Sequence, residues 1–557
     1  MKRKKVMTMV LAGVLASTMS LTGCGSSTSS NKTTAKLTPD KNQEVTVSIP
    51  VGDVQTLDAS KGTDAYSAYI LQESMEALAR EEVINGKDVF VPDGASSWNV
   101  SSDGKTWTFH LRASKWSDGK AVTADQYVYS IKRTLNPATA SQYAYLLTGA
   151  NIVGAANYNS GKGNAAQVGV KAINPLTLQI TLTSPCAYFE KLLSNKLFVA
   201  QREDMVNKYG ARYGITSQSL VYNGPFEITN FDNGNKVVMA KNPDYWDNKS
   251  VKLNTLTFLF MGDENARMNA FMSGEIDQVP VLSDNWKNKF EQGNKYNENT
   301  IISPITSYVF FNTKNKYFKN VDIRKAFSLA IDRNEYVKVV RQGIGKPAFG
   351  WVPPSVLVGT TNFRSKVPEE LVNSTQNLKQ LLATGLKQIG ANPDPSKMSI
   401  TYLESGTDEL SKEDGDFMIN QFKTKLGVNI NVNYMEWAQY NAEVTKGAYD
   451  MSTMAWGADY NDPMTFLDMF ETGANVVTNY WSDKTYDALI ADAGSTMNET
   501  RRLADFQKAE NILVNTQAVI APTYYQQFPI FTSKVIHGMQ IPLISNIEWK
   551  YAYTSGR

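Results

Sequence analysis

The N-terminal segment constrains this chain most strongly, because it sets the compartment in which the chain must fold. Residues 2–5 read Lys-Arg-Lys-Lys, and residues 6–19 are apolar apart from two threonines, one serine and one glycine. A basic start followed by a short apolar stretch and small residues is typical of an export signal, and the stretch is too short for a stable membrane span. The sequence therefore predicts export.

The segment ends in Leu21-Thr22-Gly23-Cys24, which resembles the bacterial lipobox. The resemblance implies that residues 1–23 are a lipoprotein signal peptide, removed before Cys24, whose thiol then carries lipid. Residues 24–41 are rich in Ser, Thr, Asn and Lys, which favours a flexible tether. We expect an extracytoplasmic protein, anchored by lipid to the outer face of the cell membrane, as in Gram-positive bacteria. An ordinary signal peptide that ends near a cysteine is the alternative.

The cysteine content leaves no intrachain disulfide for the mature chain. After Cys24 the only cysteine is Cys186. An exported chain without cross-links must be stabilised by its core, and a chain of this length can bury a large one. Its length indicates about three domains or large lobes. We expect Cys186 to be a small buried apolar residue at the end of a strand.

Charge and motifs argue against nucleic-acid binding and against familiar enzyme classes. Basic and acidic residues number 56 and 54, and there are only two histidines. Nucleic-acid binding proteins usually need a clearly basic face. The chain has no Walker A loop, nucleophile elbow or His-Glu-x-x-His pattern. Ser-x-x-Lys occurs at 102–105 and 117–120, but both copies contain Asp-Gly, which favours a tight turn. We expect no enzyme activity, metal or cofactor, although counting does not exclude a carboxylate pair.

Hydrophobic periodicity predicts strands and helices mixed along the chain, which indicates an α/β class with mixed sheets. The predicted strands are 44–49, 105–112, 172–183, 236–241, 253–261, 308–312, 429–435 and 450–456. The predicted helices are 66–79, 123–135 with a capping box at Thr123, 265–273, 322–330, 332–340, 378–389, 417–426 and 501–514.

Several short blocks resemble, in order, those of the oligopeptide-binding lipoproteins of ABC importers, the extracellular solute-binding family 5. The resemblance extends over about residues 44–557, and the blocks are 107–112 (WTFHLR), 116–119 (WSDG), 122–125 (VTAD), 223–226 (NGPF), 242–246 (NPDYW), 273–277 (SGEID), 321–324 (VDIR), 330–333 (AIDR), 426–428 (LGV) and 457–461 (GADYN).

The resemblance implies a two-lobed, periplasmic-binding-protein-like type II fold with an extra domain on the first lobe. The first lobe would be discontinuous, built from 42–91, 200–304 and 527–557. The extra domain would be 92–199 and the second lobe 305–526. The chain would then cross between the lobes near 304 and 526, where such proteins close around their ligand.

The resemblance also implies a binding site. Asp459 matches the aspartate that binds a peptide ammonium, although it could instead brace the turn at 460–463. The strand before it, with Ala455, Trp456 and Gly457, would offer a free edge for pairing with a peptide backbone. The alternative is an ordinary strand of the hydrophobic core. The resemblance also places five residues at pocket positions: Tyr143, Asn269, Tyr308, Trp437 and the acidic Glu76. Core packing is the alternative for the aromatic residues, and a solvated helix face is the alternative for Glu76.

Together these matches imply a monomeric receptor that captures oligopeptides and delivers them to the permease of an ABC importer. Some relatives place cations near the second-lobe strand, where this chain has Ser411, Val444 and Thr453. We therefore expect no strict selection of peptide length through the ligand's C-terminal carboxylate. The alternatives are the same fold binding a dipeptide, pheromone peptide, nickel complex, haem or sugar, and a surface enzyme or a signalling or adhesion receptor.

Overall fold

The computed structural model describes residues 37–50, 54–372, 376–474 and 480–557. The signal peptide, Cys24 and most of the expected tether lie outside these residues. Residues from Pro39 onward form one compact unit. Within the described ranges, no helix has the length and apolar character needed to cross a bilayer.

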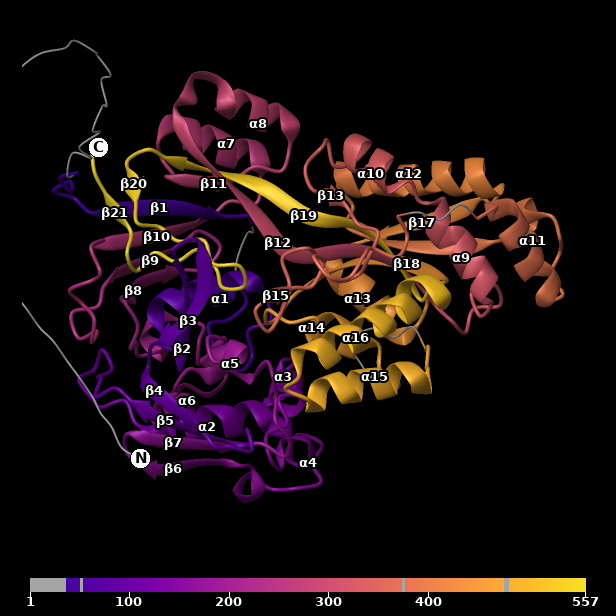
Figure 1. The fold of residues 1–557 in the computed structure, drawn as a ribbon. Coiled ribbons are helices and arrows are strands. Elements are labelled where there is room, and N and C mark those ends of the chain that lie inside the picture. Colours follow the sequence, from indigo (N-terminus) through magenta and orange to yellow (C-terminus); the bar gives the residue numbers. More distant parts are fainter. Residues whose placement is uncertain (1–36, 51–53, 373–375, 475–479) are drawn as a thin grey trace, which may run out of the picture. The chain divides into compact units, whose positions relative to one another are not determined.

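An eleven-stranded mixed sheet runs through this unit (Figure 1), in the order β17-β16-β18-β12-β19-β11-β1-β10-β9-β8, with β13 paired to β19. Its strands are β1 (Glu44–Ile49), β8 (Phe226–Asp232), β9 (Lys236–Lys241), β10 (Thr255–Phe260), β11 (Gln278–Pro280), β12 (Tyr296–Phe311), β13 (Lys346–Pro347), β16 (Ile400–Ser405), β17 (Ile430–Met435), β18 (Met451–Gly457) and β19 (Ile520–Ser533).

The long strands β12 and β19 connect the two halves of this sheet. They pair antiparallel from Tyr296 opposite Ser533 to Phe310 opposite Ile520. β11 pairs with one end of β19, whereas β18 pairs with the far end of β12. The register between β12 and β19 shifts between Ile302 and Thr306, at the junction of the two halves.

The main core contains residues from both halves of the sheet, such as Val47 and Tyr308, and helices on each half bury a further core. Helices α7 (Glu264–Ser273) and α8 (Asp284–Glu291) enclose a small core that includes Phe271 and Phe290. A larger core on the other half includes Phe327 and Phe422 and is contributed by α9 (Val321–Ala330), α10 (Arg333–Val339), α11 (Leu378–Gln388) and α12 (Glu409–Leu426). The remaining helices of this half are α13 (Trp437–Lys446), α14 (Met464–Leu467), α15 (Lys484–Ser495) and α16 (Glu499–Glu510).

A four-stranded sheet lies beside the first half, in the order β4-β5-β7-β6 (Figure 1). Its strands are β4 (Ala95–Val100), β5 (Thr106–Leu111), β6 (Val170–Asn174) and β7 (Thr177–Thr181). The helices that lie between β5 and β8 along the chain are α2 (Ala124–Leu135), α3 (Ala144–Gly149), α4 (Ala155–Asn159), α5 (Phe189–Leu192) and α6 (Glu203–Tyr209). The helix α1 (Ala65–Ser74) and three short strand pairs complete the fold: β2 (Ala79–Ile84) with β3 (Lys87–Pro92), β14 (Leu357–Val358) with β15 (Thr361–Asn362), and β20 (Ile536–His537) with β21 (Tyr553–Thr554).

Much of the local prediction is confirmed. The class is mixed α/β, and β1 and β9 begin and end where the sequence places them. The capping box at Thr123 is present at the start of α2. Both Asp-Gly pairs are turns, with Gly104 and Gly119 at positive φ. Cys186 is buried.

Five predicted elements are wrong in extent. The strand expected over 308–312 is the end of β12, which begins at Tyr296, and the helix expected over 417–426 is the C-terminal part of α12, which begins at Glu409. The helix expected over 66–79 ends at Ser74, because Met75 turns extended and the chain enters β2 at Ala79. The strand expected over 172–183 is a hairpin, since Asn174 Oδ1 accepts a hydrogen bond from the Leu176 amide and turns the chain at Pro175. The helix expected over 501–514 is α-helical only to Glu510 and continues as a π-helical turn over Asn511–Thr516.

Candidate ligand-binding site

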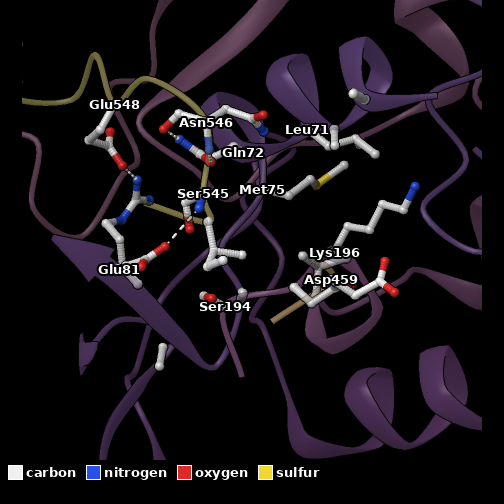
Figure 2. Close-up of a pocket in the computed structure, with 18 of the residues that line it drawn as sticks. Leu71, Gln72, Met75, Glu81, Ser194, Lys196, Asp459, Ser545, Asn546 and Glu548 are labelled. Atoms are coloured by element: carbon white, nitrogen blue, oxygen red, sulfur yellow. Dashed lines mark hydrogen bonds and ion pairs between the residues drawn. The ribbon is translucent and has the colours of Figure 1, made fainter. Parts of the chain in front are cut away.

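A cavity of about 210 Å³ lies between α1 with the following strand β2, the segment 194–199, the loop after β18 and the segment 544–548 (Figure 2). These four regions are far apart in sequence. The residues that line the cavity include Asp64, Leu71, Gln72, Met75, Arg80, Glu81, Tyr143, Ser194, Lys196, Ala458, Asp459, Ser545, Asn546 and Glu548.

Asp459 is held in this cavity by two hydroxyl groups. It follows Gly457, the last residue of β18, by two positions. Its Oδ2 accepts hydrogen bonds from the Tyr145 hydroxyl at 2.5 Å and the Thr465 hydroxyl at 3.4 Å. The backbone amide of Asp459 donates to Thr465 Oγ1 at 3.2 Å. Tyr145 on α3 and Thr465 on α14 therefore fix the carboxylate from two sides.

The environment of Asp459 makes its charge poorly hydrated. Burial raises the pKa of Asp459 to about 6, while the hydrogen bonds from Tyr145 and Thr465 and the positive charge of Lys196 act in the opposite direction. The Lys196 ammonium donates to the Gly62 carbonyl and lies 4.5 Å from the centre of the Tyr143 ring. A partly desolvated carboxylate binds an ammonium more strongly than a hydrated one does.

The turn after Asp459 is braced by a different aspartate. Asp462 receives two hydrogen bonds from the Arg502 guanidinium, at 2.7 and 2.8 Å, and accepts a third from the Met464 amide at 3.1 Å. Both Asp462 and Arg502 are almost fully buried. Asp462 therefore braces this turn as well, while Asp459 both bonds to Thr465 across the turn and lines the cavity.

The strand β18 leads to this carboxylate with an open edge. On one side its whole length pairs with β12, including Trp456 opposite Thr306. On the other side β16 pairs only with Met451 and Ser452. In the part of the chain that the structure describes, no strand pairs with the other edge of residues 453–457, which include the exposed Ala455. The Trp456 indole donates to the Thr465 carbonyl at 2.8 Å, which ties this strand to the Asp459 loop.

Only some of the predicted pocket residues line the cavity. Tyr143 lines the cavity, and its hydroxyl donates to the Thr63 carbonyl at 3.3 Å. Tyr308 is fully buried, with its ring centre 4.5 Å from that of Trp351. Asn269 is exposed on α7, and Trp437 is 58% exposed at the start of α13.

The expectations for Glu76 are corrected by the structure. Glu76 lies after the end of α1 and is 1% exposed, so it is on neither a helix nor a solvated face. It forms an ion pair with Arg80 at 2.9 Å and accepts a hydrogen bond from the Trp246 indole at 3.1 Å. Glu76 is thus part of a buried ionic cluster just outside the residues that line the cavity.

Three residues around Asp459 were missed in the sequence: Tyr145 and Thr465, which hydrogen-bond to it, and Lys196, whose charge lowers its pKa. Tyr145 lies 314 residues from Asp459, and nothing local signals that pairing. Thr465 is close in sequence, but its hydroxyl reaches back only because the 460–463 turn reverses the chain. Among the described residues, no cluster of His, Cys, Asp or Glu has the arrangement of a metal site.

Comparisons with known proteins agree with this architecture. Residues 89–477 match the family described as bacterial extracellular solute-binding proteins, family 5 Middle. The chain is 32% identical over 501 residues to the dipeptide-binding protein DppE of Bacillus subtilis, covering 89% of each chain. It is 31% identical over 482 residues to the periplasmic oligopeptide-binding protein OppA of Salmonella typhimurium, covering 85% of each.

Solved structures are similar over nearly the whole described chain. The murein tripeptide-binding protein MppA of Escherichia coli superposes with a TM-score of 0.82 at 27% identity, and Listeria monocytogenes OppA bound to peptide with 0.79 at 26% identity. Each comparison covers 93% of this chain and 100% of the other. This likeness confirms the two-lobed α/β fold. The chain therefore belongs to the bacterial extracellular solute-binding proteins of family 5.

Proposed function

We propose that this protein is a lipid-anchored receptor that captures oligopeptides between its two lobes and delivers them to the permease of an ABC importer. The observation that carries the proposal is the Asp459 carboxylate, poorly hydrated and directed into a cavity at the end of an open strand edge. The names of its relatives, which include dipeptide- and oligopeptide-binding proteins, support the same ligand class.

The site suits the parts of a peptide that do not vary with sequence. Asp459 would pair with the N-terminal ammonium, and the open edge of residues 453–457 would hydrogen-bond to the extended peptide backbone. Such contacts give affinity without selecting side chains, and water can mediate the remaining contacts. This chemistry is binding alone, and the ligand leaves unchanged.

We propose lobe I as residues 42–91, 200–304 and 527–557, the extra domain as 92–199 and lobe II as 305–526. The pairing of β12 with β19 supports these boundaries. Ile302 lies opposite Gln527 and Thr306 opposite Tyr525, so the ladder is interrupted close to both proposed crossing points. A β-bulge locally disrupts pairing and bends the strand, which suits a hinge.

The ammonium contact is tested by Asp459→Asn. We expect this variant to bind an unmodified tripeptide at least about tenfold more weakly, because a charge-assisted hydrogen bond is lost. N-acetylation of the same peptide should weaken binding to the wild type by a similar factor and add little to the defect of the variant. Isothermal titration calorimetry on the purified protein measures all four affinities.

Asp416→Asn is the matched control, because Asp416 is an exposed aspartate on α12. It should bind like the wild type. Native mass spectrometry of the purified protein should also find co-purifying peptides, and added peptide should raise the melting temperature through mass action. If no peptide co-purifies, binds or shifts the melting curve, the peptide proposal is wrong.

A further inference from the structure

Among the other carboxylates that line the cavity is Glu81, on a different side from Asp459 (Figure 2). Glu81 lies on β2 opposite Phe90 of β3 and is 1% exposed. Its Oε2 accepts a hydrogen bond from the Ser545 amide at 2.7 Å. Its Oε1 is buried and has no hydrogen-bond partner among the described residues. A buried carboxylate oxygen without a partner is costly, so a ligand donor that reached it would be strongly favoured.

Glu81 follows Arg80, which is the centre of a buried ionic cluster. The cluster contains the cations Arg80 and Lys550 and the carboxylates Glu73, Glu76, Asp93 and Glu548. Burial raises the pKa of Glu73 and of Asp93 well above the usual range, so the number of carboxylates does not give the net charge of the cluster.

The cations of the cluster are already paired with other groups. Arg80 forms ion pairs with Glu76 at 2.9 Å, with Asp93 at 3.3 Å and with Glu548. Lys550 pairs with Asp247 at 3.1 Å.

The partly buried Arg112 is also engaged elsewhere. Its Nε donates to the backbone carbonyl of Asp93 at 2.7 Å, and its guanidinium lies 3.7 Å from the centre of the Trp246 ring. No ion pair to Glu81 is formed by any of these cations. The charge of Glu81 is therefore left for another cation to balance.

The pKa of Glu81 agrees with this geometry. Burial raises it to about 7, while the backbone amide and hydroxyl of Ser545 act in the opposite direction and the charge of Asp88 adds to the rise. An ionised Glu81 is thus costly in the empty cavity. A cation beside it would remove that cost.

We propose that Glu81 is a specificity residue that binds a cationic side chain, an ammonium or a guanidinium, of a peptide whose N terminus is held at Asp459. The inference rests on the proposed function and adds a side-chain preference to it. A cation is favoured over a neutral donor because Glu81 forms no ion pair with a described residue and one of its oxygens has no hydrogen-bond partner. A bound metal is disfavoured because the described residues include no metal-ligating arrangement at this position.

The test compares tripeptides that differ only in charge. Lysine or norleucine is placed at each position of trialanine, since norleucine keeps the aliphatic stem of lysine without its ammonium. Affinities are measured by calorimetry at pH 8, where Glu81 is ionised, for wild type, Glu81→Gln and Glu82→Gln. Glutamine keeps an oxygen for the Ser545 amide. Glu82 is the matched control because neighbouring residues of a strand point to opposite faces, and its carboxylate accepts from the Tyr551 hydroxyl instead.

At one position we expect wild type to prefer lysine to norleucine by about tenfold or more. Glu81→Gln should abolish that preference by weakening the lysine peptide alone, whereas Glu82→Gln should retain it. If wild type binds the peptides but shows no charge preference at any position, or if Glu81→Gln weakens both peptides equally, the assignment of Glu81 is overturned while peptide binding stands. If wild type binds none of the peptides, the proposed function fails as well.

Discussion

At the residue scale, the candidate site depends on how two nearby aspartates are partnered. Asp462 is matched by Arg502, a cation of the same lobe, and is closed off within the core. Asp459 receives neutral hydroxyl donors from Tyr145 and Thr465 and only the longer-range charge of Lys196. Neutral donors orient a carboxylate without neutralising it, so Asp459 keeps a charge for a ligand.

This environment predicts a pH dependence of peptide binding. The pKa of Asp459 is raised to about 6, so the carboxyl is protonated well below that pH and ionised above it. A peptide ammonium stays protonated from pH 5 to about 7 and begins to lose its proton near pH 8. We therefore expect affinity for a free-amino peptide to be highest near pH 7 and to fall roughly tenfold as the pH is lowered to 5. Calorimetry from pH 5 to 8 measures this.

The Asp459→Asn variant is the control for this pH profile, because it has no carboxyl to titrate at that position. Its weaker affinity should change little over the same range. An equal loss of affinity on acidification in both proteins would show that another group is responsible.

At the element scale, α2 shows how one polar side chain ties a helix start to the core. Gln126 Oε1 accepts a hydrogen bond from the Thr123 amide at 3.0 Å and another from the Trp116 indole at 2.9 Å. Trp116 is 1% exposed. The capping box therefore also satisfies the indole donor of a large buried side chain, which fixes α2 against the loop that precedes it.

Gln126→Ala should accordingly destabilise the protein without affecting the ligand site. We expect a cost of roughly 1–3 kcal/mol, because the buried Trp116 indole loses its acceptor and the Thr123 amide its cap. Thermal melting and urea unfolding of the ligand-free protein measure the loss. Gln126→Glu keeps both acceptors and should be much closer to wild type. Weaker peptide binding in the alanine variant, with unchanged stability, would contradict this account.

At the scale of the whole molecule, residues 92–199, the proposed extra domain, contact residues 305–526, the proposed lobe II. The Lys191 ammonium donates to the Leu357 carbonyl at 3.3 Å and to the Asn461 carbonyl, and it lies 3.9 Å from Asp462. The Tyr188 and Tyr460 rings stack with centres 4.4 Å apart. These contacts join residues 92–199 to residues 305–526, so they stabilise the arrangement in which Tyr145 reaches Asp459.

Lys191→Met should weaken peptide binding, although Lys191 is not expected to contact the peptide. The substitution removes charged hydrogen bonds across the two segments, each worth about 1.5–3 kcal/mol at most, and so favours separation of the lobes. We expect a several-fold loss of affinity and a larger radius of gyration in X-ray scattering with peptide present. Lys162→Met, at an exposed position of the same segment, is the control. Equal affinity and radius in the two variants would rule out this role for Lys191.

Local patterns were sufficient for much of the fold. Alternation of apolar residues identified β1 and β5, and short-range chemistry identified the Thr123 cap and the two Asp-Gly turns. Predictions were less accurate where a stretch of apolar residues had no capping or turn residue to mark its end. The helix over 66–79 ran past Ser74, because the switch to β2 is imposed by the contacts of residues 75–84 and not by their own propensities.

The sequence by itself determined the mixed α/β class and the positions of the elements with clear local patterns, because these depend on residues close together in the chain. The candidate carboxylate at Asp459 came from the resemblance to a known family. Only the tertiary structure decided which residues surround that carboxylate. It brought Tyr145 to Asp459 across 314 positions, buried Tyr308 and Glu76, and placed Glu81 in the same cavity. The physical reason is that burial and pKa depend on what packs around a group, and those neighbours come from distant segments.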